Sequence, residues 1–143
     1  DVQMDMVLHS GASGFALGYD TDGKSTTQDM ALRGSPAGGG YASANDLLRF
    51  ATALEDGKLV SRSTLAEMTT GYTEMGPGMA YGYGFGVAEG KETHYGHTGG
   101  SPGADASFEV FPESGYAVIV LSNQGERSRD VAQTLTGLVL ARK

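Results

Sequence analysis

The sequence predicts an α+β fold of the α/β-sandwich type, in which an antiparallel sheet carries packed helices. Apolar residues follow helical spacing in the middle of the chain, alternate with a period of two afterwards, and return to helical spacing at the end. Turn residues separate the strand-like segments at short intervals, which favours hairpins. Glycine makes up 23 of 143 residues, about 16% against an average near 7%, so we expect many tight turns or close backbone approaches.

The length of 143 residues fits a single domain with one core, residues 1–143. Within it, we expect an irregular, loop-rich stretch over 1–42, a helical hairpin over 43–70, and strands followed by a C-terminal helix over 81–143. Residues Asp1 to Leu8 show neither the basic nor the apolar region of a secretory signal, and the chain does not start with Met. We therefore expect a processed or excised piece of a longer protein.

The first helix is predicted to follow Ser43, a residue type that caps free backbone N–H groups. Asp46 occupies the third helical position of a capping box, and apolar residues recur at helical spacing behind it. Gly57 is expected to end this helix. A second, shorter helix should run from about Ser63 to Thr70 and complete the hairpin.

The strands begin with Tyr81–Val87, where aromatic and apolar residues alternate with glycines and leave one face bare. After a turn, Thr93–Thr98 should return as the second strand of a hairpin. Ala104–Val110 alternates and predicts a half-exposed strand. The unbroken apolar run Tyr116–Leu121 is typical of a central strand covered on both faces.

A final helix is expected to start at Glu126 or Ser128. Its apolar residues predict an inward-facing stripe, and its basic end suits the negative end of the helix dipole. The stripe is expected to contain Val131, Leu135, Leu138 and Val139, with Arg142 and Lys143 at the end.

Charge and composition exclude several function classes. Ten Lys and Arg against seventeen Asp and Glu give a net charge of −7, which disfavours a nucleic-acid partner. No apolar run approaches the roughly 20 residues of a membrane-spanning helix. Without Cys, thiolate catalysis and Cys-based zinc sites are excluded.

The densest chemical feature is the segment His97–Gly103 (HTGGSPG), between two predicted strands. Its structural interpretation is a glycine-rich reversal. Its functional interpretation is a histidine that handles protons, followed by Gly99 and Gly100, whose N–H groups an oxyanion can approach. Residue chemistry alone leaves both interpretations open and favours the structural one.

The order of several motifs resembles the penicillin-recognising serine hydrolases, which include class C β-lactamases, D-Ala-D-Ala carboxypeptidases, D-aminopeptidases and related esterases. The resemblance covers most of the chain, and the order is more specific than any single motif. The motifs are Ala16–Tyr19, Pro36–Gly39, Ser43 with Asp46–Leu47, Tyr81–Gly86, Gly96–Gly100, Pro102–Gly103 and Val118–Asn123.

The resemblance implies that His97, Thr98 and Gly99 form the third active-site motif of the family, in its His-Thr-Gly variant. Gly100 would donate its backbone N–H to the oxyanion hole, and His97 would set the electrostatics and proton transfers of the site. Tyr95 shares a strand face with His97. We therefore consider it for a wall of the substrate cleft, together with Ser101, although core packing is an equal alternative for Tyr95.

The family's other motifs are missing from this sequence. No Ser stands three positions before any of the four Lys, and no Tyr stands two positions before either Asn, so neither Ser-x-x-Lys nor Tyr-x-Asn occurs. Ser43-Ala44-Asn45 imitates a Ser-x-Asn motif, but helix capping explains it better. The spacing Gly99–Gly103 also fits a nucleophile elbow, which we reject because Pro102 has no N–H and no His follows Ser101.

No metal or cofactor is predicted. His94 and His97 are three residues apart on a strand, so their side chains should emerge on opposite faces. Glu92 and Asp105 are interpreted as solvated or turn residues. Tyr81 and Tyr83 are interpreted as packing residues.

The resemblance implies the C-terminal portion of a serine hydrolase that acts on amide or ester bonds (β-lactam, D-Ala-D-Ala peptide or ester) through an acyl-enzyme, and that is inactive alone. The alternatives are a noncatalytic domain that binds peptides or cell-wall fragments, and a half-protein completed by a separate N-terminal chain. Family members pair their last sheet strand with strands of the N-terminal part, so the resemblance implies that 116–121 lies here at an unpaired apolar edge. We expect the N-terminal portion of the same fold, self-association, or the terminal helix to cover that edge. Family members commonly work outside the cytoplasm, so an extracytoplasmic location is the expectation.

Overall fold

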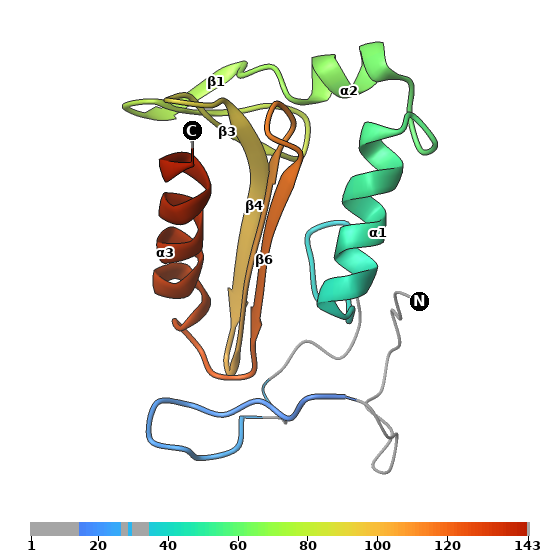
Figure 1. Cartoon of the computed structure of the whole chain (residues 1–143). Helices are drawn as coiled ribbons and strands as arrows, with labels where there is room; N and C mark the ends of the chain where they lie inside the picture. Colours follow the sequence, from blue (N-terminus) through green and yellow to red (C-terminus); the bar gives the residue numbers. More distant parts are fainter. Residues whose placement is uncertain (1–14, 27–28, 30–34, 143) are drawn as a thin grey trace.

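The computed structural model describes residues 15–26, 29 and 35–142. The described residues form three layers, a six-stranded antiparallel sheet with α1 and α2 over one face and α3 over the other (Figure 1). The strand order follows the chain, from β1 to β6. This is the α+β fold that the sequence predicts. The elements are α1 (Ala44–Glu55), α2 (Arg62–Met68), β1 (Thr73–Gly76), β2 (Met79–Tyr81), β3 (Gly86–Ala88), β4 (His94–Ser101), β5 (Ala104–Phe111), β6 (Tyr116–Ser122) and α3 (Ser128–Ala141).

The helical hairpin forms as expected. Ser43 caps α1, because its hydroxyl accepts a hydrogen bond from the Asp46 N–H at 3.2 Å while the Asp46 carboxylate accepts from the Ser43 N–H at 3.1 Å. Gly57 follows the end of α1 with a φ of 72°, a conformation that glycine adopts without strain. Ser61 caps α2 through a single bond of this kind, because its hydroxyl accepts from the Thr64 N–H at 3.1 Å. None of the helices in the described part of the chain has the length and apolar character needed to cross a membrane.

The core has two parts, one on each side of the sheet. Between the sheet and the helices α1 and α2 lie Ala51, Leu54, Leu65, Phe85, Val87, Tyr95, Phe108 and Val110. Between the sheet and α3 lie Phe111, Val118 and Ala132. The expectation of a half-exposed β5 is therefore wrong. Ser107 and Phe111, on the α3 side of this strand, are 1% and 0% exposed because α3 covers them.

The expected strand over Tyr81–Val87 is also wrong, because the chain reverses in its middle. β2 ends at Tyr81 and β3 begins at Gly86, and the Gly82 N–H donates to the Phe85 carbonyl at 2.8 Å. Gly84, in the turn, has a φ of 83°. The regular spacing of glycines predicts a bare strand face, but Gly82 and Gly84 instead belong to the turn. β1, which pairs with β2, was not predicted.

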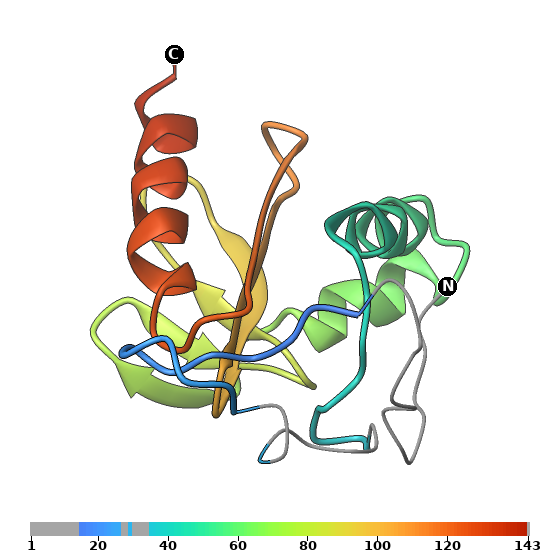
Figure 2. The same ribbon diagram turned by 90° about the horizontal axis from the view of Figure 1, so that it is seen from below.

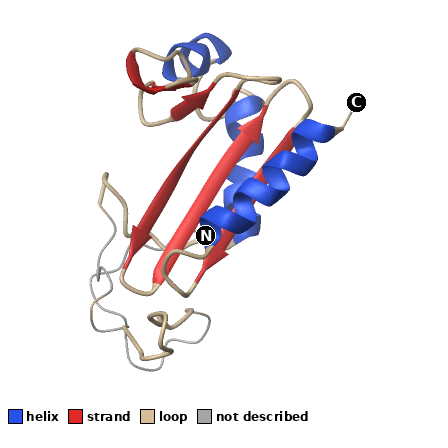
Figure 3. Cartoon of the chain, turned by 90° about the vertical axis from the view of Figure 1, so that its left-hand side faces the viewer, coloured by secondary structure: helices blue, strands red, loops and turns tan. Residues whose placement is uncertain are grey.

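α3 starts at Ser128 as expected, but it turns a different face to the sheet. Val131, Leu135 and Leu138 are 49%, 39% and 60% exposed, so the predicted stripe is wrong for these three residues, whereas its fourth member, Val139, does pack against the core. The side that faces the sheet combines apolar residues with donors to polar groups of β5. The Ser128 N–H donates to Asp105 Oδ2 at 2.7 Å and the Thr136 hydroxyl to Glu109 Oε2 at 2.6 Å, while Ala132, Val139 and Leu140 complete the contact. Figure 3 shows α3 lying along the sheet.

β6 is an edge strand among the described residues, not the central strand that its composition favours. It pairs with β5 alone, although α1 and α3 contact it from either face. This agrees with the expectation of an unpaired apolar edge over 116–121. α3 packs against one face of the β5–β6 pair rather than across the edge (Figure 1).

The described residues before α1 form turns and isolated bridges, which matches the expected irregular stretch. One part of this stretch runs beside the end of β6 (Figure 2). Tyr19 forms a parallel bridge with Gln124, its N–H donates to the Asn123 carbonyl at 2.9 Å, and the Asn123 amide donates to the Leu17 carbonyl at 3.0 Å. The expectation about Asp1 to Leu8 concerns residues outside those that the structure describes.

Candidate active site

The direction of backbone groups along β3 follows from two hydrogen bonds to β2. The Gly82 N–H donates to the Phe85 carbonyl and the Glu89 N–H donates to the Gly78 carbonyl, each at 2.8 Å. In an antiparallel ladder, both backbone polar groups of a residue point to the same side, and the side alternates from one residue to the next. Phe85 and Glu89 therefore point towards β2, and Gly86 points towards β4.

The same alternation fixes the outer side of β4. Gly86 pairs with Gly96, and β3 contributes no residue beyond this pair. Gly96, Thr98 and Gly100 thus direct their N–H and C=O groups to the side of β3, where no described strand pairs with the last two. The His97 ring supports this assignment, because its Nδ1 lies 2.6 Å from the Thr98 carbonyl oxygen. Among the described residues, no strand therefore occupies the N–H of Gly100, which leaves it open to a ligand.

The structural interpretation of His97–Gly103 as a glycine-rich reversal applies only to its end, because β4 continues to Ser101. Gly99 and Gly100 lie within the strand and pair with Ala106 and Asp105, and the turn comes only at Pro102 and Gly103. An added Cβ on Gly99 meets no described atom within 4 Å. The strand therefore presents bare backbone beside His97. Of the two expected oxyanion donors, however, only the Gly100 N–H points outward; the Gly99 N–H points towards β5, where Gly99 pairs with Ala106, so the expectation is wrong for Gly99.

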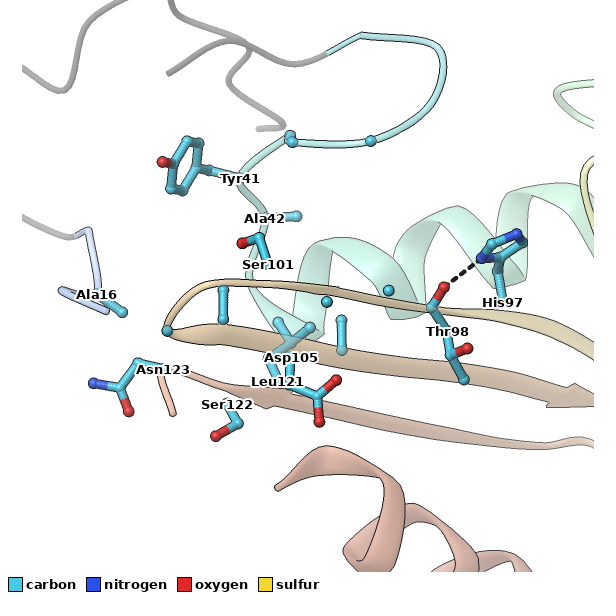
Figure 4. Close-up of a pocket in the computed structure, with 18 of the residues that line it drawn as sticks. Ala16, Tyr41, Ala42, His97, Thr98, Ser101, Asp105, Leu121, Ser122 and Asn123 are labelled. Carbon is cyan, nitrogen blue, oxygen red and sulfur yellow. Dashed lines mark hydrogen bonds between the residues drawn. The ribbon is translucent and has the colours of Figure 1, made fainter. Parts of the chain in front are cut away.

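A groove of about 990 Å³ lies along this part of β4. The residues His97, Thr98, Gly99, Gly100 and Ser101 all line it, so the structure brings five of the six sequence-predicted site residues together. Ser43 and Asp46, from the start of α1, and residues of the loop before it also line the groove. Figure 4 shows His97, Thr98 and Ser101 along the strand, with Tyr41 and Ala42 across from them.

The sixth residue, Tyr95, lies in the core rather than in the groove. It is 4% exposed, and its hydroxyl donates to Glu55 Oε1 of α1 at 2.5 Å. Burial, reinforced by the Glu55 carboxylate, raises the pKa of Tyr95 above its ordinary value. The interpretation as a cleft wall is therefore wrong. Tyr95 and His97 share a strand face, but Tyr95 is buried against the C-terminal end of α1, whereas His97 is exposed and lines the groove.

Sequence reasoning missed Tyr81, which it assigned to packing. The Tyr81 hydroxyl lies 2.9 Å from His97 Nε2, and the two rings meet edge to face with centroids 5.8 Å apart. Both nitrogens of the His97 ring are thus engaged. The contact depends on the unpredicted turn after Tyr81, so the sequence pattern carried no signal for it.

The two histidines of β4 are used differently. His94 stacks on Phe111 with ring centroids 4.5 Å apart and lies 4.0 Å from the Glu109 carboxylate, on the α3 side of the sheet. His97 lines the groove on the other side. Within the described ranges, no three His, Asp or Glu side chains are grouped as a metal site would need.

The acidic residues beside these histidines have structural roles. The carboxylate of Asp105 accepts from the first N–H of α3, and that of Glu92 accepts from the Ser114 N–H at 2.8 Å. Ser101 precedes a turn that leads into β5, not into a helix. The geometry of a nucleophile elbow is therefore missing, in agreement with its rejection from the sequence.

Solved structures with the same fold support this description. The penicillin-binding protein of Bacillus halodurans superposes with a TM-score of 0.86 at 23% identity, over 96% of this chain and 44% of that one. The octameric penicillin-binding protein homologue of Pyrococcus abyssi gives 0.76 at 25%, over 90% and 31%. The D-amino acid amidase of Ochrobactrum anthropi, in complex with D-phenylalanine, gives 0.62 at 25%, over 85% and 44%.

The chain spans less than half the length of these similar structures. A search of curated proteins gives no match. The model of the Beta-lactamase family, in contrast, matches residues 7–142, which is nearly the whole chain. Together with the fold and the His-Thr-Gly strand, this match shows that the chain belongs to the Beta-lactamase family, a family of β-lactamase-like serine hydrolases.

Proposed function

We propose that this chain is the C-terminal portion of a serine hydrolase that cleaves amide or ester bonds, such as those of β-lactams, D-Ala-D-Ala peptides or esters, through an acyl-enzyme. It would supply one wall of the active site, formed by His97 and the Gly100 N–H, and be inactive alone. The observation that carries the proposal is the free outer edge of β4 at Thr98 and Gly100, which faces a groove beside a histidine.

The Gly100 N–H would act on the charge that develops during the reaction. When a serine Oγ adds to the substrate carbonyl, the carbonyl oxygen becomes an oxyanion, and a donor already in place stabilises it without reorganisation. Collapse of this intermediate expels the amine or alcohol and leaves the acyl group on the serine. Water then hydrolyses that ester. His97 would assist the proton transfers of these steps.

The nucleophile is the part that this sequence does not contain, because it has no Ser-x-x-Lys. Ser43, which lines the groove, is committed to capping α1, and its hydroxyl lies 2.7 Å from Asp46 Oδ2. One of the similar structures named above is a D-amino acid amidase, which supports amides among the substrates. We therefore assign the attacking serine to a segment that precedes this one in the complete enzyme.

The first test uses the chain as it is. Intact-mass spectrometry after incubation with a β-lactam or a fluorophosphonate should find no stoichiometric adduct. An adduct on Ser43 or Ser101 would overturn the proposal, as would saturable hydrolysis by the purified chain that is lost when one of its own hydroxyls is removed. Sequencing the gene upstream of Asp1 should then identify a Ser-x-x-Lys in frame, and a panel of acyl substrates on the complete protein should reveal the activity.

The second test separates the two glycines of the motif. Gly100→Pro removes an N–H that points away from β5, where proline is tolerated at a strand edge, whereas Gly99→Pro removes an N–H of the β4–β5 ladder. In the complete enzyme, Gly100→Pro should keep the melting temperature and lower the acylation rate by about 100- to 1000-fold. Gly99→Pro should lower the melting temperature. A stable Gly100→Pro variant with an unchanged rate would exclude this N–H from the oxyanion hole.

A further inference from the structure

A tyrosine hydroxyl contacts the candidate proton-handling histidine from outside the groove. Tyr81 Oη lies 2.9 Å from His97 Nε2, and the ring planes cross at 81°. His97 lines the groove, whereas Tyr81 is not among the lining residues. Any influence of Tyr81 on a ligand in the groove is therefore exerted through His97.

The second contact of the ring determines where its hydrogen lies. His97 Nδ1 is 2.6 Å from the Thr98 carbonyl oxygen, which can only accept a hydrogen bond. In the neutral ring, Nδ1 must then carry the hydrogen and Nε2 must carry the lone pair. It follows that the Tyr81 hydroxyl is the donor to Nε2. The two contacts together select one tautomer of His97.

The position of Tyr81 is itself fixed by the backbone. The Tyr72 N–H donates to the Tyr81 carbonyl at 3.0 Å, and the Tyr83 N–H donates to the Met68 carbonyl at 2.9 Å. Gly82 leaves no room for a side chain, because an added Cβ would lie 2.1 Å from the Met68 carbonyl oxygen. The turn that carries Tyr81 is thus held against the end of α2.

We propose that Tyr81 is a positioning residue that holds His97 in its Nδ1–H tautomer and fixes the orientation of its ring. The contact suits a histidine that gains and loses a proton. When Nε2 takes up a proton, it becomes the donor and the Tyr81 oxygen the acceptor, while the phenolic hydrogen rotates away. The hydrogen bond therefore persists in both protonation states. The catalytic consequence of this role rests on the proposed function.

The chain itself allows a direct test by NMR with ¹⁵N-labelled histidine. His97 should show the Nδ1–H tautomer, with the Nε2 resonance shifted by a hydrogen bond. Tyr81→Phe keeps the ring and removes the hydroxyl, so the Nε2 resonance should move towards that of an imine nitrogen without a donor. Tyr83→Phe is the matched control, because Tyr83 is 61% exposed and packs against Tyr72, and it should change nothing at His97. An Nε2–H tautomer in the wild type, or a Tyr81→Phe spectrum that superimposes on the wild-type one, would overturn the proposal.

A kinetic test follows in the complete enzyme. Tyr81→Phe should lower kcat by about tenfold with KM little changed, because one hydrogen bond that orients His97 is lost. In a His97→Ala background, Tyr81→Phe should cause no further loss. An equal loss in both backgrounds would show that Tyr81 acts independently of His97 and would refute the assignment. If the complete protein hydrolyses no acyl substrate, the proposed function fails, and the NMR result still decides the role of Tyr81.

Discussion

Replacing Gly96 by alanine tests how closely β4 and β5 approach each other beside the candidate site. Gly96 directly precedes His97 and pairs with Glu109 across the ladder. An added Cβ would lie 1.9 Å from the Phe108 carbonyl oxygen and 2.9 Å from the Glu109 Cα. These are backbone atoms, so no side-chain rotation relieves the clash.

The size of the effect follows from these distances. Real Cβ contacts essentially never fall below 3.0 Å, so the strands must separate locally by at least 3.0 − 1.9 = 1.1 Å. Overpacking of this kind costs about 1–3 kcal/mol. If two ladder hydrogen bonds are weakened as well, at about 0.5–1.5 kcal/mol each, the free energy of unfolding should fall by about 2–6 kcal/mol in total. Since domains are stable by about 5–15 kcal/mol, this is a large fraction.

Gly99→Ala is the control in the same strand, because its added Cβ meets no described atom within 4 Å. Its effect on the free energy of unfolding should stay within about 0.5 kcal/mol. Urea denaturation followed by far-UV circular dichroism measures both variants, since the chain has no Trp. The midpoint for Gly96→Ala should drop by about 1 M or more with an unchanged slope. Equal midpoints for the two variants would refute the described register of β4 against β5.

Two further predictions concern the core and the edge of the sheet. Tyr95→Phe should lower the free energy of unfolding by about 1–3 kcal/mol at neutral pH, because the partly buried Glu55 carboxylate loses its donor. Burial raises the pKa of Tyr95 above its ordinary value of about 10, so the phenol stays protonated in the folded state at pH values where it ionises in the unfolded one. The free energy of unfolding of the wild type should therefore fall as the pH rises above about 10. In Tyr95→Phe, the contribution of Tyr95 to this decrease should be missing, which urea titrations at a series of pH values would measure. At the edge strand β6, we expect self-association, so multi-angle light scattering should find species larger than the 14.8 kDa monomer. Amide exchange along 116–121 should slow as the protein concentration rises. A monomer with rapid exchange there would exclude self-association through β6.

Local patterns predicted the parts of the fold that depend on local chemistry. The capping box of Ser43 and Asp46 and the positive φ at Gly57 place α1 where the sequence indicates. The expectation for α3 failed because packing, not hydropathy, chooses its buried face. Asp105 and Glu109 of β5 accept hydrogen bonds from that helix, and no pattern within the helix itself encodes these distant partners.

The sequence predicted those parts of the candidate site that lie on a single strand. His97 to Ser101 follow one another in the sequence, so a strand assignment was sufficient to place them along one groove. Tyr95 shows the limit of this reasoning, because alternation gives the face of the sheet but not which side chains on that face a helix buries. Tyr81 shows another limit, since it contacts His97 from sixteen residues away in the sequence.

The turn at 82–85 explains both why Tyr81–Val87 is not one continuous strand and why the outer edge of β4 is open. In the register that pairs Gly86 with Gly96, a continuous strand would have set residues 85 to 82 against residues 97 to 100 and satisfied the outward N–H groups of Thr98 and Gly100. The turn at 82–85 removes that partner and, in the same step, places Tyr81 beside His97. Substitutions that convert this turn into strand should therefore occupy the Gly100 N–H and, at the same time, remove the Tyr81 contact from His97. The length of β3 thus determines the candidate site as much as the His-Thr-Gly motif does.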